Sequence, residues 1–254
     1  MSSEELVYGL HAVQALLKSS PQQVQQLLLL RGRRDQRLQK ILAQAEKNNI
    51  AVSVVDRRTL DEKVGDDGNH QGVVAVCAGQ TRVYDERFLQ ELLQELEQRG
   101  EAPFLLILDG VTDPHNLGAC LRSAEAAGVH AVIAPKDKSA GLTPTARKVA
   151  CGAAEVLPFV TVTNLARAMQ KLQQAGVWIF GAAGEAEQDV YHSQLTGPLA
   201  LVMGAEGSGL RRLTREHCDH LIKIPMAGEV SSLNVSVATG VCLFEAVRQR
   251  ATAG

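Results

Sequence analysis

Short apolar runs that end in glycine-rich or polar loops are the feature that most restricts how this chain can fold. The run at 104–108 is entirely apolar, as expected for a strand buried on both faces. Further strand patterns cover 131–134, 155–160, 177–181, 199–203 and 221–224. Helical patterns separate or follow them at 117–127, 143–150, 163–175, 209–217 and 233–249. This alternation predicts an α/β fold with a parallel sheet, whose carboxyl edge is where such folds hold ligands.

A smaller α/β pattern precedes this one. Helical patterns lie at 9–18 and 35–48, and strand patterns lie at 24–30, 50–55 and 73–77. The polar stretch that follows contains one amphipathic pattern, at 85–98, which predicts an exposed helix. We therefore expect an N-terminal domain at 1–78, a linker at 79–102 and a second domain at 103–254.

Composition describes a globular chain. Of its 254 residues 45% are hydrophobic and 21% are charged, and no apolar run is long enough to predict a membrane span or a secretory signal. Its five cysteines form no Cys-x-x-Cys pair, which favours reduced thiols and a cytoplasmic location. The net charge of −2 suits an RNA-binding protein poorly, although segment 31–40 carries five basic residues and one acid. A solvated helix face is the alternative interpretation of that segment.

The loop after 104–108 carries the first candidate site residues. Asn116 is a good N-cap for the next helix, whose free N–H groups would point into the loop. Arg122 lies further along the same helix among leucine, alanine and cysteine residues, so we expect its guanidinium to be buried or to face a cleft. A buried charge needs a partner or a function. For Asn116, capping alone is the alternative.

A glycine-rich loop follows 199–203 and contains Gly204, Glu206 and Gly209. Glycines let the backbone approach a ligand closely. A phosphate-binding loop is the alternative, but the loop lacks Gly-Lys-Ser/Thr and a regular G-x-G-x-x-G pattern, and Glu206 would repel phosphate. A carboxylate at this place suits a cationic sulfonium cofactor or an arginine partner better.

The third block joins the last strand to the last helix. Ile224 and Met226 stand at the strand end, and Ser232, Leu233 and Asn234 open the helix. Capping of the helix could account for the serine and the asparagine without any ligand.

Two other features are weaker. Gly184 follows 177–181, where a small residue permits close approach of a ligand or simply makes a turn. His217 and His220 have the look of metal ligands, but no second ligand pair accompanies them, so no metal site is expected.

Together the three blocks resemble the signature motifs of the SpoU (TrmH) branch of the SPOUT methyltransferases, which methylate ribose 2′-hydroxyls of RNA. The resemblance extends to 6–78, which is similar to the family's L30e-like substrate-binding domain through the segments 8–13 and 70–72. It implies a deep trefoil knot in the second domain, with the last helix threaded through a loop.

The resemblance also implies S-adenosyl-L-methionine as cofactor and a homodimer that completes each site, with neither metal nor membrane involved. The implied substrate is a guanosine in the peptidyl-transferase P loop of 23S rRNA. The implied roles place Arg122 at the ribose hydroxyl, with the ribose and the arginine positioned by Asn116, Glu206, Ser232 and Asn234. The cofactor wall would consist of Gly184, Gly204, Ile224, Met226 and Leu233.

Three alternatives stay open. The same chemistry could act on tRNA or on another rRNA site, although the extra N-terminal domain favours rRNA. The chain could be a non-catalytic rRNA-binding protein, against which Arg122, Glu206 and Asn234 argue. It could also be a nucleotide-binding enzyme for a small molecule, which would not need the first domain.

Overall fold

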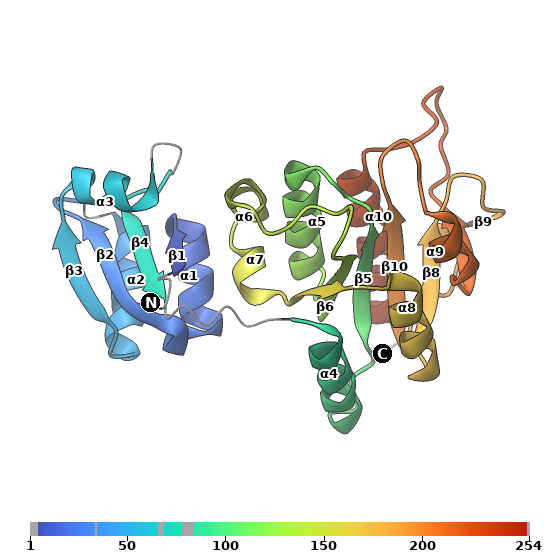
Figure 1. Ribbon diagram of the computed structural model, residues 1–254, viewed down its shortest axis with the longest axis horizontal. Helices are drawn as coiled ribbons and strands as arrows, with labels where there is room; N and C mark the ends of the chain where they lie inside the picture. The colour runs from blue at the N-terminus through green and yellow to red at the C-terminus, as the bar shows by residue number, and fades with distance from the viewer. Residues whose placement is uncertain (1–4, 34, 66–68, 78–83, 253–254) are drawn as a thin grey trace. The chain divides into compact units, whose positions relative to one another are not determined.

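The computed structural model describes residues 5–33, 35–65, 69–77 and 84–252. Contacts within the chain divide it into two compact units (Figure 1). The first unit comprises 1–82 and the short segment 151–156, and the second comprises 83–150 and 157–254.

The first unit contains a four-stranded sheet with the order β1-β4-β2-β3. Strand β4 pairs antiparallel with β1 and β2, whereas β2 and β3 are parallel. The elements, in chain order, are β1 (Glu5–Tyr8), α1 (Leu10–Ser19), the 3-10 turn η1 (Pro21–Gln23), β2 (Val24–Leu30), α2 (Gln36–Lys47), β3 (Ala51–Val55), α3 (Arg57–Val64) and β4 (Val73–Cys77).

Helices cover both faces of this sheet. Helices α1 and α2 bury Leu16 and Ile41 against one face, and α3 buries Leu60 against the other (Figure 1). The strands therefore carry apolar side chains on both sides, which explains why 73–77 is continuously apolar rather than alternating.

The segments 8–13 and 70–72 meet where α1 begins. The Gln71 side-chain oxygen accepts from the backbone N–H of Leu10 at 3.1 Å, which satisfies a free donor of the first helical turn. Buried His70 accepts from Gly72 through Nδ1 at 2.9 Å, which leaves the Nε2 proton to be donated to Asp61, also at 2.9 Å. These residues therefore have a structural role in joining β4, α1 and α3.

The second unit contains a seven-stranded sheet with the order β7-β6-β5-β10-β8-β11-β9, in which neighbouring strands pair in parallel. Its elements are α4 (Glu86–Gln98), β5 (Phe104–Asp109), α5 (Pro114–Ala126), β6 (Ala131–Pro135), α6 (Pro144–Ala150), β7 (Phe159–Val162), α8 (Leu165–Gln174), β8 (Trp178–Ala182), β9 (Gln188–Asp189), η2 (Val190–His192), β10 (Leu199–Gly204), α9 (Arg212–Glu216), β11 (His220–Lys223) and α10 (Val235–Thr252).

Two layers of helices enclose this sheet. Helices α4 and α8 bury Leu89 and Met169 against one face, and α5 and α10 lie on the other (Figure 1). The central strands β5 and β10 are buried along their length, so their carboxyl ends and the loops that follow are held by a rigid core.

Most predicted elements are present, and the exceptions have physical causes. The strand predicted at 155–160 exists but begins later: residues 153–156 form the short helix α7, and β7 begins only at Phe159, after Pro158. Strands β1 and β9 and helix α3 were not predicted, because they are short or carry few apolar residues.

Within the expected linker, residues 79–83 lie outside the described part of the chain. Residues 86–98 form α4, whose leucine stripe packs on the second sheet instead of facing solvent.

Candidate active site

The three sequence blocks meet at the carboxyl edge of the second sheet. Strands β5 and β10 are neighbours, and their last residues, Asp109 and Gly204, are partners in the register. The first two blocks therefore leave the sheet side by side. The third block joins them through Asn234, which immediately precedes α10.

Asn234 connects the blocks through its side-chain amide. Its Nδ2 donates to Asn116 Oδ1 at 3.0 Å and also to the carboxylate of Glu206. Its Oδ1 accepts from the backbone N–H of Ser236 at 2.9 Å, so it also caps α10. Capping and assembly of the site are thus functions of the same side chain.

The prediction that Asn116 is the N-cap of α5 is wrong. The helix begins at Pro114, and Asp113 caps it by accepting from the backbone N–H of His115 at 3.0 Å. Proline is favoured at this first helical position because the lost N–H would have no helical partner. Asn116 lies within the first turn, is 9% exposed, and directs its amide oxygen to Asn234.

Glu206 lies in a tight loop that closes on itself. Ala205 and Gly209 exchange backbone hydrogen bonds of 3.1 and 2.9 Å. A Cβ atom at Gly204 would lie 2.2 Å from the carbonyl carbon of Gly209, so only glycine is compatible with this turn. The glycine requirement at 204 thus arises from the loop itself.

Arg122 and Ser232 are both exposed. Of the two settings expected for the Arg122 guanidinium, burial is wrong for the single chain, and a position facing a cleft stays a prediction. The face of α5 that enters the core carries Leu117, Cys120 and Leu121, which leaves Arg122 on the outer side.

Of the five residues predicted for the cofactor wall, four lie in loops and one, Gly204, ends a strand at this edge. Gly184 follows β8, and a Cβ atom there would meet nothing within 4 Å, so the space beside it is open. Ile224, Met226 and Leu233 are half-buried apolar residues outside helix and strand, and Gly204 ends β10. Free space, half-buried apolar groups and the nearby Glu206 carboxylate fit an adenosine bearing a sulfonium.

The pKa of the Cys120 thiol is raised to about 11, mainly by burial and additionally by the negative charge of Glu206. Its sulfur lies 3.5 Å from Thr239 Oγ1 of α10. Cys120 is therefore a neutral packing residue beneath the site.

Sequence reasoning missed one charged pair at this edge. The Asp109 carboxylate is fully buried, and it accepts from both the backbone and the side chain of Arg211. An acidic residue at the end of the apolar run 104–108 was the signal that could have identified it.

The sequence 217–220 has structural contacts rather than the geometry of a metal site. His217 Nδ1 contacts the Leu213 carbonyl oxygen at 2.8 Å, and Asp219 accepts from the backbone N–H of Ile179 at 2.8 Å. Across the described ranges, no three His, Cys, Asp or Glu residues gather as metal ligands would.

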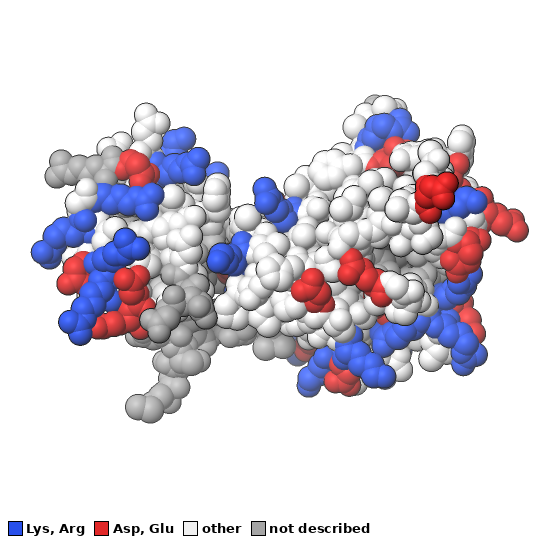
Figure 2. Space-filling model, turned by 90° about the horizontal axis from the view of Figure 1, so that it is seen from above, with Lys and Arg blue, Asp and Glu red and all other residues white. Residues whose placement is uncertain are grey.

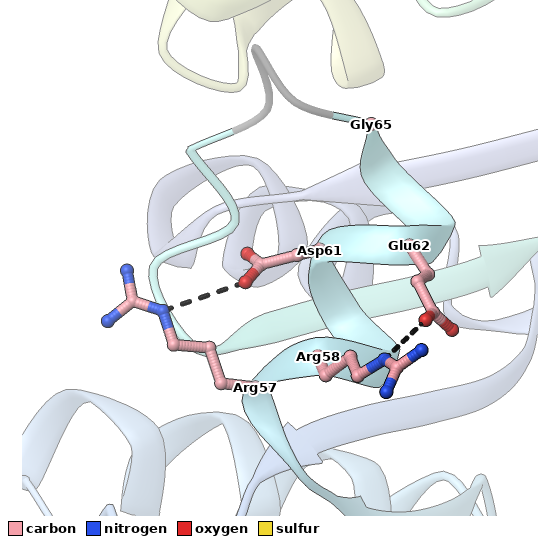
Figure 3. Close-up of a pocket in the computed structure, with 5 residues that line it drawn as sticks. All are labelled: Arg57, Arg58, Asp61, Glu62 and Gly65. Carbon is pink, nitrogen blue, oxygen red and sulfur yellow. Dashed lines mark hydrogen bonds and ion pairs between the residues drawn. The ribbon is translucent and has the colours of Figure 1, made fainter.

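A surface pocket occurs in the first unit and does not belong to this site. It is formed by α3, where Arg57 and Arg58 pair with Asp61 and Glu62 at 3.7 and 2.7 Å, and Gly65 closes the helix (Figure 3). These opposite charges neutralise one another. On the face shown in Figure 2, basic and acidic side chains are likewise interspersed.

An α/β fold with a parallel sheet and a polar cluster at its carboxyl edge is the architecture of a ligand-binding enzyme. The model described as the SpoU rRNA Methylase family matches residues 103–244. The model described as RNA 2'-O ribose methyltransferase substrate binding matches 6–83. The chain belongs to the SpoU rRNA methylase family.

Individual relatives agree with this assignment. The chain is 62% identical over 250 residues to the 23S rRNA (guanosine-2'-O-)-methyltransferase RlmB of Pseudomonas putida, with 98% of each chain covered. It is 61% identical over 247 residues to RlmB of Escherichia coli, covering 97% of this chain and 99% of the relative.

Among solved structures, the SpoU methyltransferase AviRb from Streptomyces viridochromogenes in complex with AdoMet has a TM-score of 0.76 and 26% identity. The match covers 99% of this chain and 92% of the AviRb chain. In the part of the chain that the structure describes, no helix has the length and apolarity to cross a membrane.

Proposed function

We propose that this protein transfers a methyl group from S-adenosyl-L-methionine to the ribose 2′-hydroxyl of a guanosine in the peptidyl-transferase P loop of 23S rRNA. The observation that carries the proposal is the hydrogen-bonded set Asn116–Asn234–Glu206, which joins all three blocks at one edge of the sheet. The relatives named as 23S rRNA guanosine methyltransferases, which match the chain over nearly its full length, supply the substrate.

The chemistry requires a polarised hydroxyl. Bound S-adenosylmethionine supplies an electrophilic methyl group on a positively charged sulfur. The ribose 2′-oxygen would accept that methyl group, and its hydroxyl proton would pass to water. Arg122 is a poor base, because a guanidinium donates hydrogen bonds and has no acceptor, but its positive charge favours the developing alkoxide.

The other polar residues orient the reactants. Asn116, Glu206, Ser232 and Asn234 hold the ribose and Arg122 for in-line attack, so orientation contributes much of the rate. The backbone at Gly184, Gly204, Ile224, Met226 and Leu233 holds the cofactor. The Glu206 carboxylate also favours a cationic sulfonium nearby.

The first unit, proposed as a domain over 1–78, grips folded rRNA by shape and phosphate contacts so that the target nucleotide can be splayed out. Its match to the substrate-binding family model supports this role. We also infer that it is L30e-like, for which its sheet with helices on both faces is the support. Residues 79–102 connect it to the methyltransferase domain, 103–254.

Two further features of the family are proposed for the second domain. The last helix, α10, is threaded through a loop as a trefoil knot, which an experimental structure traced through 199–252 would test. Two chains form a homodimer that completes each site. Exposed Val237 and Phe244, seven residues apart on α10, support a partner on that helix, since their side chains are 52% and 49% exposed.

The decisive test is transfer of labelled methyl from S-adenosylmethionine to purified 23S rRNA and, in parallel, to bulk tRNA, with the product mapped. A single 2′-O-methyl on a P-loop guanosine is expected. A cytoplasmic location, where bacterial ribosomes are found, belongs to the same proposal. Label on tRNA alone would overturn the substrate. Binding of the cofactor without label on either RNA, or on assembly intermediates, would favour a non-catalytic rRNA-binding protein.

A further inference from the structure

The buried carboxylate of Asp109 has no place in the proposed chemistry, although it lies at the same edge of the sheet. It is the last residue of β5 and is fully buried, whereas the Arg211 side chain that pairs with it is 45% exposed. Burial of a charged carboxylate is unfavourable unless it is paired and hydrogen-bonded. Such a residue in a strand that is otherwise apolar therefore needs a structural or functional reason.

Both oxygens of the Asp109 carboxylate contact Arg211. Oδ2 accepts from the backbone N–H of Arg211 at 2.8 Å, and Oδ1 accepts from the Arg211 Nε at 2.5 Å. A second guanidinium nitrogen pairs with the same oxygen. Both the backbone and the side chain of Arg211 are thereby fixed to the end of β5, a geometry that a lysine could not reproduce.

The residues between these anchors form the loop that carries Glu206. One base of the loop is Gly204, whose position is set by its pairing with Asp109 in the sheet. The other base is Arg211, which Asp109 holds directly. Between them, Ala205 and Gly209 close a turn with Glu206 near its tip. Asp109 therefore contacts both ends of the loop.

We infer that Asp109 and Arg211 are positioning residues: their ion pair holds the loop 204–211 so that the Glu206 carboxylate meets the Asn234 amide. The inference rests on the proposed function for the role of Glu206 in the reaction. It assigns no contact with RNA or cofactor to either residue of the pair.

A double-mutant cycle distinguishes positioning from a general loss of structure. Asp109→Asn keeps an oxygen for the Arg211 N–H groups and removes the charge, while Arg211 can be hydrated. We expect a fall in kcat of roughly tenfold at saturating RNA and cofactor, with both KM values within about threefold. In the Glu206→Gln background the same substitution should change kcat less than about twofold, because the group it positions is already gone.

A second readout does not depend on turnover. Amide hydrogen exchange across 205–210, measured without cofactor, should be faster in Asp109→Asn than in the parent, while exchange in β5 is unchanged. Arg211→Lys, which keeps the charge and loses the planar fork, should show the same exchange change and the same non-additivity. If Asp109→Asn does not fold, Arg211→Lys takes its place in the double-mutant cycle. Glu216→Gln, which removes the partner of exposed Arg212 in α9, is the matched control and should behave as the parent.

Each outcome has one meaning. If Glu206→Gln has the parent kcat, the proposed role of Glu206 fails, whatever the pair does to loop exchange. If Glu206→Gln is impaired and Asp109→Asn is not, the inference alone fails. Equal losses in both backgrounds, or unchanged exchange across the loop, also overturn it, because the pair would then act on something other than Glu206.

Discussion

Asn234 illustrates how much a single side chain contributes when both ends of its amide are engaged. Its oxygen caps α10, and its nitrogen contacts residues of the other two blocks. An amide is the group that suits this position, because an aspartate would lack the donor and would repel Glu206. The two contributions can be separated by substitution.

Asn234→Ser should retain an oxygen that can cap α10 but lose the amide N–H donors to Asn116 and Glu206. Asn234→Ala should lose the capping oxygen as well as these donors. We expect the free energy of unfolding of the serine variant to stay near that of the parent, and that of the alanine variant to fall by about 1 kcal/mol. Turnover should fall in both variants. Urea unfolding and a methyl-transfer assay measure the two effects, and a serine variant with full turnover would show that the amide donors are dispensable.

Arg122→Ala should separate binding from catalysis. Arg122 is exposed, so its removal should leave the fold and cofactor binding unchanged, while turnover falls by about 100-fold or more through loss of electrostatic stabilisation. Calorimetry of cofactor binding and the methylation assay provide the measurements. Arg87→Ala, which removes an exposed arginine from α4, is the control. Near-normal turnover of Arg122→Ala would remove this residue from the mechanism.

At the scale of elements, the contact between α5 and α6 depends on Gly118. A Cβ atom there would lie 2.5 Å from the Ala146 carbonyl oxygen and 2.7 Å from the Val149 Cβ. The glycine in the first block therefore permits close packing of two helices rather than access for a ligand. The position of Asn116, two residues earlier, depends on that packing.

Gly118→Ala should therefore destabilise the protein by about 1–3 kcal/mol, because α6 must move to accept the methyl group. Gly141→Ala is the matched control, since a Cβ atom there meets nothing within 4 Å. Thermal unfolding of the two variants tests the difference. Equal melting temperatures would mean that the helices can separate without cost.

The sequence was sufficient to predict the strands that are buried on both faces, because a continuous apolar run as short as 104–108 favours a central strand over a helix or a loop. It also identified the three blocks of the site. The acidic residue at the end of that run could have indicated Asp109, but the sequence could not reveal its partner Arg211, 102 positions away, or the burial of α4 against the sheet. Both depend on tertiary packing, which local patterns do not encode.

At the scale of the whole molecule, buried thiols should make stability decrease in alkaline solution. Burial raises the pKa of Cys242 to about 12 and is the main cause of a similar rise for Cys218. A thiol with a higher pKa in the folded state retains its proton there and loses it on unfolding. The stability that a buried protonated thiol contributes is therefore fully present below pH 9, the pKa of the unfolded state. It is lost as the pH rises toward 12, the pKa of the folded state.

The free energy of unfolding should depend less on pH in Cys242→Ala than in the parent, by up to about 1.4 kcal/mol per pH unit above pH 9. Urea unfolding of both proteins from pH 8 to pH 10.5 would measure it. Comparison with the parent cancels the titration of lysines and tyrosines. Parallel curves for the two proteins would contradict the prediction.

Phe244→Asp should shift the proposed homodimer toward monomer and lower turnover, because it places a charge within an apolar contact. Sedimentation at micromolar concentration and the methylation assay measure both effects. Val54→Asp, at a position 57% exposed in the first unit, is the control. A parent protein that is monomeric in the same experiment would refute the proposed assembly.

The amide of Asn234 also has a consequence for synthesis of the chain. Asn116 and Glu206 leave the ribosome well before Asn234, and α10 continues to Thr252, so a nascent chain holds two parts of the site without the residue that connects them. The proposed site is therefore complete only once Asn234 has been synthesised and has reached Asn116 and Glu206. Termination of the chain before Asn234 should leave the other two blocks without the residue that joins them, and the product without activity.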